Sequence, residues 1–437
     1  MAKDGQIYET RPLEFWAKAK ELRAGWQQSI ESTDTVVGQG NILAIADWSR
    51  AFPAIGLVED NPAGSMIASQ SSPFARKCRL ASEIRGWGRE ICGYNNTCWG
   101  GQFLGFQEDG SPFPYRQFVV PIPCVCDSHT KRGEQVKDFS PVPRWQLDFN
   151  MYLGERDPDR ELVMYDHKTY CTLKQVNDIE RIFGQEFGDE KLIDMIRSSS
   201  LVGKYRDDVS AFMRHIPAPL TAKDLYSFFT MGMLTKIDPD ETVRFWKMFR
   251  DEVEWRVQNN IAAVGNEQFR WLEAHPPSWH YLKYYRYMEQ RYGAVCIGSQ
   301  YTSGSLEMKP DGSVGRREYP AYPADTPLET REDIFRYWAG IEARGPHTWK
   351  MDEYLRPYAL NEFAQIYQAD GALLALWRSG VGCNLTRKEQ AKRLREAGYS
   401  VLLFEGSQPG DRNDMDELRF LDQLDDWMES QGFRPFE

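Results

Sequence analysis

The feature that most constrains the fold is a regular alternation of short apolar runs and helical patterns in the C-terminal part of the chain. The apolar runs, which we expect to be strands, are residues 269–274, 294–297, 372–377 and 401–404. The helical patterns lie at residues 279–291, 331–341, 352–368 and 387–397. Such alternation is typical of a mostly parallel sheet with helices on both faces. Ligands of these sheets bind at the carboxyl ends of the strands, so we expect a functional site at that edge.

Two helix starts in this part carry capping signals. The last helix is expected to begin after Asp414, which Glu417 follows three residues later. Thr386 and Glu389 stand in the same relation before the helix at 387–397. In a capping box of this kind the two side chains satisfy backbone N–H groups of the first turn. The last helix should bury one apolar stripe, which consists of Met415, Leu418, Leu421, Leu424 and Met428.

The preceding part of the chain divides into three regions. Apolar residues at helical spacing in 12–30 predict an amphipathic helix, which we interpret as an N-terminal arm. Short apolar runs at 42–48 and 117–122, separated by a Gly- and Ser-rich stretch, indicate a first α/β region. From residue 173 to about residue 260 the apolar spacing is helical.

We therefore predict an α/β protein with two flavodoxin-like parallel-sheet lobes, a helical connecting region and an N-terminal helical arm. The arm is placed at residues 1–40 and the first lobe at 41–172. The connecting region is placed at 173–262 and the second lobe at 263–437.

Composition narrows the classes of function. The 437 residues include 23 Phe, 21 Tyr and 14 Trp, enough to fill large cores. A net charge of −11 disfavours non-specific attraction to nucleic acid phosphates or anionic lipid. No run approaches the roughly 18 apolar residues of a membrane span, and the start lacks the apolar segment of a signal peptide, so we expect a cytoplasmic protein. Eight cysteines are too sparse for a disulfide framework, so we expect thiols or metal ligands.

Several common catalytic motifs are missing from the sequence. There is no Gly-x-x-x-x-Gly-Lys-Ser/Thr phosphate loop, and no Gly-x-Gly-x-x-Gly opens a helix after a strand. We therefore expect no nucleotide binding of either kind. Gly-x-Ser-x-Gly and His-Glu-x-x-His are missing too, and the six histidines are too scattered to suggest zinc by spacing.

Three cysteines stand in defined settings outside apolar periodic segments. Cys92 lies in a polar, Gly-rich segment that we expect to form a turn. Cys126 follows the expected strand at 117–122, and Cys383 lies between the expected strand at 372–377 and the next helix. Helix N-termini and glycine amides stabilise thiolates and donate hydrogen bonds to cluster sulfides. A three-cysteine iron–sulfur site fits these settings.

Two other interpretations of the cysteines stay open at this point. All eight could be buried small hydrophobes, which is the interpretation we prefer for Cys78, Cys171 and Cys296. Zinc is the second alternative, with Cys98 or Cys124 completing a four-sulfur set. The separations match neither common ferredoxin run, so spacing alone does not decide between them.

The chain also carries short motifs in a specific order. They are Cys92-Gly-Tyr, Cys126-Asp-Ser-His-Thr-Lys-Arg, Leu173-Lys-Gln-Val-Asn-Asp-Ile-Glu-Arg-Ile-Phe-Gly and Arg378-Ser-Gly-Val-Gly-Cys383. From about Asn41 to its C-terminus, the sequence resembles the cluster-bearing subunits of benzoyl-CoA reductase and the related 2-hydroxyacyl-CoA dehydratases. Its last segments, 401–412 and 421–432, look most like the B-type subunit of benzoyl-CoA reductase.

This resemblance implies a 4Fe-4S cluster held by three cysteines, which would be Cys92, Cys126 and Cys383 here. The fourth iron site then has no matching residue. Cys98 and Cys124 are extra thiols nearby in the sequence, and each could supply a fourth ligand or fill space. We favour the space-filling role for both.

The resemblance further implies one iron–sulfur subunit of an ATP-dependent, ferredoxin-linked benzoyl-CoA reductase. Such an oxidoreductase of anaerobic aromatic degradation reduces the ring of benzoyl-CoA by two electrons to a cyclohexadiene carboxyl-CoA. The implied partners are a homologous cluster-bearing subunit, ATP-hydrolysing activator-type subunits, reduced ferredoxin and an aromatic acyl-CoA substrate. The alternatives are a subunit of a 2-hydroxyacyl-CoA dehydratase and a noncatalytic iron–sulfur subunit for electron transfer or structure.

No residue receives a catalytic role from the sequence. The aromatic residues between Tyr281 and Tyr292 could line an acyl pocket, but their helical spacing favours core packing. His129 could deliver a proton, although a loop histidine in solvent is the simpler interpretation. Arg378 and Lys388 could contact CoA phosphates, but solvated charges are the simpler interpretation.

Overall fold

The computed structural model describes residues 6–31, 36–38, 51–53, 56–58, 71–88, 90–113, 131, 158–229, 231, 238–274, 281–299, 302, 306–309, 311–316, 327–344, 356–377, 386–406 and 416–436. The strands expected at 42–48 and 117–122 lie outside these residues. Cys124, Cys126 and Cys383 also lie outside them, as do His129 and Arg378.

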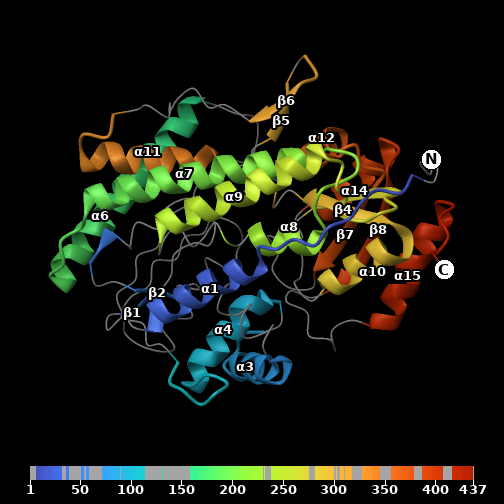
Figure 1. Ribbon diagram of the computed structural model, residues 1–437. Coiled ribbons are helices and arrows are strands. Elements are labelled where there is room, and N and C mark those ends of the chain that lie inside the picture. The colour runs from blue at the N-terminus through green and yellow to red at the C-terminus, as the bar shows by residue number, and fades with distance from the viewer. Residues whose placement is uncertain are drawn as a thin grey trace.

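A four-stranded parallel sheet organises the C-terminal part of the chain (Figure 1). Its strands are β3 (Phe269–Glu273), β4 (Ala294–Ser299), β7 (Gly371–Trp377) and β8 (Ser400–Gly406), in the spatial order β4-β3-β7-β8. Counted along the chain this order is 2-1-3-4, which is how a flavodoxin-like sheet begins. The α/β prediction is confirmed, and each expected strand lies within a few residues of the observed one. The direction of winding reverses between β3 and β7, and such a topological switch point is where open α/β sheets bind ligands.

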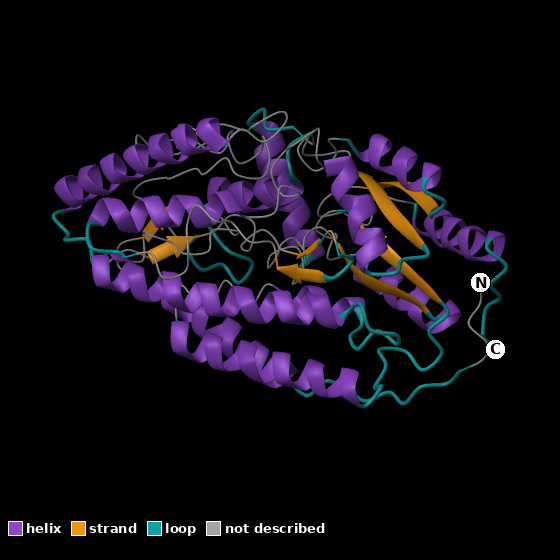
Figure 2. Ribbon diagram, turned by 90° about the horizontal axis from the view of Figure 1, so that it is seen from above, coloured by secondary structure: helices purple, strands orange, loops and turns teal. Residues whose placement is uncertain are grey.

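Side-chain alternation along the strands gives the sheet two apolar faces, both covered by helices (Figure 2). One face holds Phe269 and Trp271, and it packs on α8 (Ala222–Phe229), α10 (Leu282–Tyr292) and α15 (Glu417–Ser430). Leu272 and Ala274 belong to the other core, with α7 (Asp189–Phe212), α9 (Pro239–Gln258), α12 (Arg356–Ile366) and α14 (Arg387–Glu396). Tyr284, Tyr285 and Tyr292 of α10 are buried in the first core, which confirms core packing as their role.

Long helices fill the middle of the chain, as the sequence predicts for residues 173–260. The helical run begins earlier, with α6 (Pro158–Phe183), so Cys171 lies inside a helix rather than beside its start. Val176 and Ile179 of α6 are buried against α7 and α11 (Arg331–Arg344) in a separate core. No helix in the described part of the chain combines the length and apolar character needed to cross a membrane.

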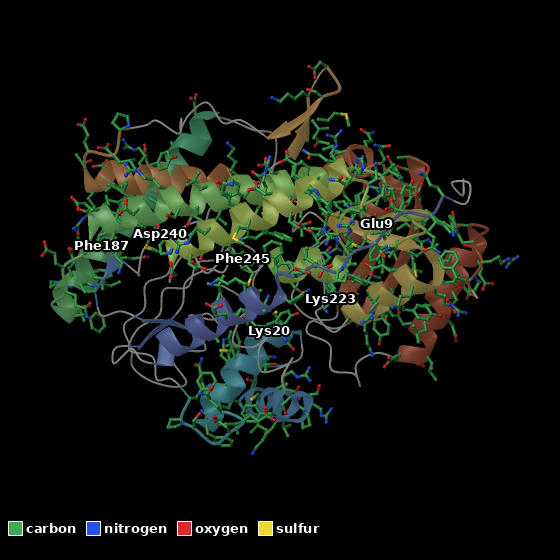
Figure 3. The ribbon with its side chains drawn as sticks, in the orientation of Figure 1. Glu9, Lys20, Phe187, Lys223, Asp240 and Phe245 are labelled. Atoms are coloured by element: carbon green, nitrogen blue, oxygen red, sulfur yellow. The ribbon has the colours of Figure 1, made fainter. Side chains whose placement is uncertain are left out.

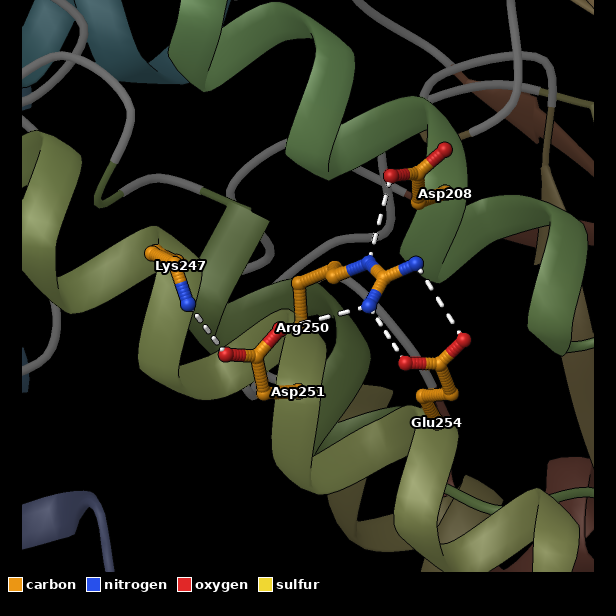
Figure 4. Close-up of polar contacts among 5 residues, drawn as sticks. All are labelled: Asp208, Lys247, Arg250, Asp251 and Glu254. Carbon is orange, nitrogen blue, oxygen red and sulfur yellow. Dashed lines mark hydrogen bonds and ion pairs between the residues drawn. The ribbon is translucent and has the colours of Figure 1, made fainter.

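An ion pair between Arg250 and Asp208 joins α9 to α7, within a group of polar contacts that otherwise lie along α9 (Figure 4). Arg250 of α9 donates from Nε to Asp208 of α7 at 3.3 Å and from Nη1 to Glu254 at 2.5 Å. Asp251 accepts from Nη1 of Arg250 at 3.2 Å and from Lys247 at 2.7 Å. The network ties two helices that pack side by side along most of their length in Figures 1 and 2.

The N-terminal arm is the helix α1 (Trp16–Glu31), as predicted. Phe15, just before it, packs edge-on against Phe245 of α9, which is labelled in Figure 3. Trp16 donates from Nε1 to Asp224 of α8 at 3.1 Å, and Lys18 pairs with Glu241 of α9 at 2.6 Å. The arm therefore docks on the helical region through an apolar stripe bordered by polar contacts.

The remaining described elements are shorter. The strands β1 (Val36–Gly38) and β2 (Gly56–Val58) pair in parallel, and β5 (Leu306–Met308) and β6 (Val314–Arg316) form an antiparallel hairpin. The helices α3 (Ser72–Ile84) and α4 (Gly93–Leu104) pack closely against each other. Both predicted capping boxes are wrong in detail.

The last helix is capped by Asp416, whose side chain accepts from the backbone N–H of Arg419 at 3.1 Å, so Asp414 is not the N-cap. Thr386 does stand at the N-cap of α14, but its φ of 62° is left-handed and its hydroxyl caps nothing. A capping-box side chain requires an extended N-cap residue, and the backbone of Thr386 does not provide one.

Candidate functional site

Cys92 stands at the N-cap of α4, and the Gly-rich segment that follows it is a helix rather than the expected turn. Its glycines serve helix packing: a Cβ on Gly100 would lie 1.7 Å from the carbonyl oxygen of Cys78 on α3. Only at Gly105, with φ of 78°, does glycine end the helix in the usual left-handed C-cap. The sequence prediction failed here because glycine codes equally for a turn and for close backbone contact.

The N-terminus of α4 is buried. All residues from Ile91 to Gly101 are buried, and Cys92 is 6% exposed. Ile91, Cys98 and Trp99 form a small apolar core, against which Trp87 packs. First-turn N–H groups lack partners within a helix and carry its positive dipole end, which favours an anionic thiolate over a neutral thiol. Cys92 makes no side-chain capping bond to this turn.

Three consecutive polar residues of α4 are buried, and they differ in how they are satisfied. The Thr97 hydroxyl donates to the carbonyl of Gly93 at 2.7 Å. The Asn96 side chain donates from Nδ2 to the carbonyl of Gly88 at 2.8 Å. Asn95 is 0% exposed, and within the described structure neither its Nδ2 nor its Oδ1 has a hydrogen-bond partner. Leaving such a group unpaired costs about 1–3 kcal/mol, so a native structure rarely keeps one without a reason.

The features around Cys92 fit an iron–sulfur cluster. The chain offers a buried thiol, a helix N-terminus directed at it and, three residues later, an amide that has no hydrogen-bond partner among the described residues. Each of these interacts favourably with an anionic group that presents sulfur acceptors. The described residues contain no cluster of three or more side chains that could hold a metal ion, and the other two predicted ligands lie outside them.

The other described cysteines lie in packed, neutral surroundings. Cys78 and Cys296 are fully buried, and burial raises the pKa of the Cys78 thiol to about 12. Burial also raises the pKa of Cys296 well above its ordinary value. Cys171 is partly buried beside the core of α6, with Sγ 3.6 Å from Nε2 of His167. These positions agree with the space-filling role expected for the three residues.

Cys98 lies six residues after Cys92 in the same helix, which is about 9 Å further along the axis. Its sulfur accepts from Nε2 of Gln102 at 3.5 Å, and it packs with Ile91 and Trp99. Helical geometry thus directs Cys98 away from Cys92, which favours the space-filling interpretation over a fourth ligand.

A second polar site lies at the carboxyl end of β3, where the sequence indicated no specific residue. Glu273 is 2% exposed and shares a sheet face with Trp271. Its Oε1 accepts from the hydroxyl of Tyr285 at 2.6 Å and its Oε2 from that of Tyr226 at 3.1 Å. Burial raises the pKa of Glu273 to about 8, and the two tyrosine hydrogen bonds offset only part of that rise. The signal in the sequence was an acidic residue at the end of a strand, on the same face as the apolar Phe269 and Trp271.

No basic side chain forms an ion pair with Glu273 among the described residues, although Arg387 lowers its pKa from a distance. The guanidinium of Arg387 is buried, and it donates to the carbonyl of Ala375 in β7 at 3.1 Å and to Gln390 at 3.0 Å. Lys388, the next residue, is exposed, as expected for a solvated charge. The carboxyl ends of β3 and β7 thus border the switch point of the sheet with one buried acid and one buried cation.

The predicted ligand Cys383 falls between the end of β7 at Trp377 and the start of α14 at Arg387. Its position along the chain follows the strand that borders the switch point. Cys383 itself lies outside the described residues, so its role as a ligand stays a prediction.

Comparison with known proteins identifies the family. The family model described as 2-hydroxyglutaryl-CoA dehydratase, D-component, matches residues 66–425 of the 437. No curated protein matches the chain. The match spans Cys92, α4, the helical region and the whole parallel sheet. This chain therefore belongs to the 2-hydroxyglutaryl-CoA dehydratase D-component family, within the 2-hydroxyacyl-CoA dehydratases and benzoyl-CoA reductases.

Proposed function

We propose that this chain is the iron–sulfur subunit of an ATP-dependent, ferredoxin-linked benzoyl-CoA reductase. The reaction is the two-electron reduction of the aromatic ring of benzoyl-CoA to a cyclohexadiene carboxyl-CoA. The observation that carries the proposal is the position of Cys92 at a buried helix N-terminus, inside the segment that matches the family. The resemblance of residues 401–412 and 421–432 to the B-type reductase subunit supports this reaction over others.

In this proposal Cys92, Cys126 and Cys383 hold a 4Fe-4S cluster. When bound, the cluster supplies single electrons at low potential. The chain's own part is to fix the cluster and to exclude water around it. The first turn of α4 favours the thiolate of Cys92, and the packed residues from Ile91 to Gly101 keep that end of the site dry.

The division of labour follows from the motifs. The sequence has no phosphate loop, so ATP hydrolysis is assigned to separate activator-type subunits. Reduced ferredoxin is the proposed electron source, and a homologous cluster-bearing subunit is the proposed partner. An isolated chain should then neither hydrolyse ATP nor reduce the thioester.

A second candidate is a subunit of a 2-hydroxyacyl-CoA dehydratase. The description of the matching family favours it, because that description names a dehydratase component. The two candidates share the scaffold and the proposed cluster, and they differ in the substrate.

The decisive experiment assays the complex, purified without oxygen, with ATP and a reductant. Benzoyl-CoA and a series of 2-hydroxyacyl-CoA thioesters are supplied in parallel. We expect the diene product from benzoyl-CoA and no dehydration of the hydroxy thioesters. Dehydration alone would establish the second candidate, and inactivity of a fully loaded complex toward both would indicate a noncatalytic iron–sulfur subunit.

A further inference from the structure

We propose that the Asn95 amide donates a hydrogen bond to a sulfur of the group that Cys92 holds and so sets its reduction potential. This inference rests on the proposed function, because it assumes a cluster at Cys92. It assigns Asn95 a positioning role rather than a catalytic one.

The geometry of a helix start brings the two residues together. Cys92 is the N-cap and Asn95 is N3, three residues later. In this arrangement the N3 side chain lies on the same side of the helix as the N-cap and reaches back toward it, as the glutamate of a capping box does. Three residues advance the helix by only about 4.5 Å. The amide of Asn95 is therefore placed within reach of whatever the thiol of Cys92 binds.

The immediate neighbours of Asn95 are each satisfied at least in part by the protein. Thr97 and Asn96 donate to the carbonyls of Gly93 and Gly88, although Oδ1 of Asn96 has no partner among the described residues. Asn95 is fully buried, and both of its terminal atoms lack a partner within the described structure. An apolar residue of the same size would cost less at such a position, so we infer a partner outside the polypeptide.

The Asn95 amide offers a donor whichever of its terminal atoms is the nitrogen. Neither atom has a partner among the described residues, so exchanging them leaves the same donor available. Thiolate and sulfide sulfurs are hydrogen-bond acceptors, and hydrogen bonds to them are one of the determinants of cluster potential. Because reduction adds negative charge, a donor stabilises the reduced state and raises the potential.

The test compares Asn95→Leu with the matched control Asn96→Leu in the complex purified without oxygen. Asn95→Leu should lower the reduced-to-oxidised ratio of the cluster at a fixed potential about tenfold, which corresponds to about 59 mV for a one-electron couple. Asn96→Leu removes a bond to the carbonyl of Gly88, so it should lower thermal stability and leave the potential in place.

A second measurement compares the melting temperatures of Asn95→Leu and the wild type without the cluster. After the cluster is removed with a chelator, Asn95→Leu should melt at a higher temperature than the wild type, because it no longer buries an unpaired amide. A structural hydrogen bond within the protein would give the opposite sign. Pulsed electron paramagnetic resonance of wild type labelled with ¹⁵N-asparagine should show a nitrogen coupling to the reduced cluster that Asn95→Leu abolishes.

The outcomes separate this inference from the proposed function. If Cys92→Ala retains its iron and its spectrum, the ligand assignment fails, and the role of Asn95 fails with it. If Cys92→Ala loses the cluster while Asn95→Leu changes neither the potential nor the melting temperature after cluster removal, only the role of Asn95 is overturned.

Discussion

The two buried polar sites differ in what satisfies them. At the start of α4, Asn95 finds no partner among the described residues. At the end of β3, two tyrosine hydroxyls contact both oxygens of Glu273. In our proposal the first site receives a group from outside the chain, whereas the hydrogen bonds of the second site are made within the protein. Burial alone therefore does not mark a binding site, since the informative quantity is the hydrogen-bonding capacity that the protein leaves unused.

The two sites also differ in the sequence separation of their residues. Cys92 and Asn95 lie three positions apart at the start of one helix, so local helix geometry arranges them. Tyr226 lies 47 residues from Glu273, and only the packing of α8 on the sheet brings them together. The first site should therefore respond to loss of a ligand, and the second to pH and to packing.

The largest expected effect is on the metal content of the first site. Changing Cys92, Cys126 or Cys383 to Ala should each remove or convert a cluster of about four iron atoms per chain, because each change removes one of three anchors. Cys78→Ala and Cys296→Ala should keep the iron and cost only packing energy, on the order of 1 kcal/mol. Iron and sulfide analysis under anaerobic conditions is the measurement. Equal iron loss from both sets would point to general destabilisation, and stoichiometric zinc would replace the redox role with a structural one.

The second site predicts a dependence of stability on pH. Burial raises the pKa of Glu273 from 4.5 to about 8, so between these values the folded state holds a proton that the unfolded state has released. The free energy of unfolding should then fall as the pH rises from 4.5 to 8, by on the order of 4 kcal/mol from this group.

Urea unfolding at a series of pH values measures this dependence. Glu273→Gln should remove the larger part of the slope. Glu289→Gln should remove a smaller part, because burial raises the pKa of Glu289 only to about 7. The same dependence on pH in Glu273→Gln and in the wild type would show that the pKa of Glu273 is not raised in the folded state.

The contact between α3 and α4 should be sensitive to the addition of a single methyl group. Gly100→Ala places a Cβ against the backbone of Cys78 and should destabilise the protein by about 1–3 kcal/mol. Gly25→Ala is the matched control, since nothing lies within 4 Å of a Cβ there. That control should be neutral or stabilising by up to about 1 kcal/mol, because alanine favours helices over glycine. Thermal unfolding of both variants is the measurement. Similar melting temperatures would contradict the close packing of α3 on α4.

The smallest expected effect concerns the cap of α15 behind the sheet. Asp416→Ala removes the acceptor for the N–H of Arg419 and should cost about 1 kcal/mol. Asp414→Ala should leave the free energy of unfolding unchanged within error. The reverse ranking would restore the capping box that the sequence alone predicts.

Periodicity in the sequence was sufficient for the elements whose pattern is local. The strands of the parallel sheet, the long helices and the arm α1 all follow from apolar spacing, because a buried face repeats every two residues in a strand and about every 3.6 in a helix. The order of motifs was sufficient for the family, which the match over residues 66–425 confirms. The lobe boundaries and the three-cysteine ligand set remain predictions.

Only the tertiary structure decided the rest. The sheet order that places the switch point between β3 and β7 depends on which strands pair, and pairing joins residues about 100 positions apart, such as Leu272 and Ala372. In the sequence the glycines of α4 predict a turn, and only the packing of α3 against α4 shows why they are needed. The lack of a partner for Asn95 among the described residues and the raised pKa of Glu273 likewise depend on burial. Burial is set by neighbours distant in the chain, because removing a polar group from water takes the whole fold.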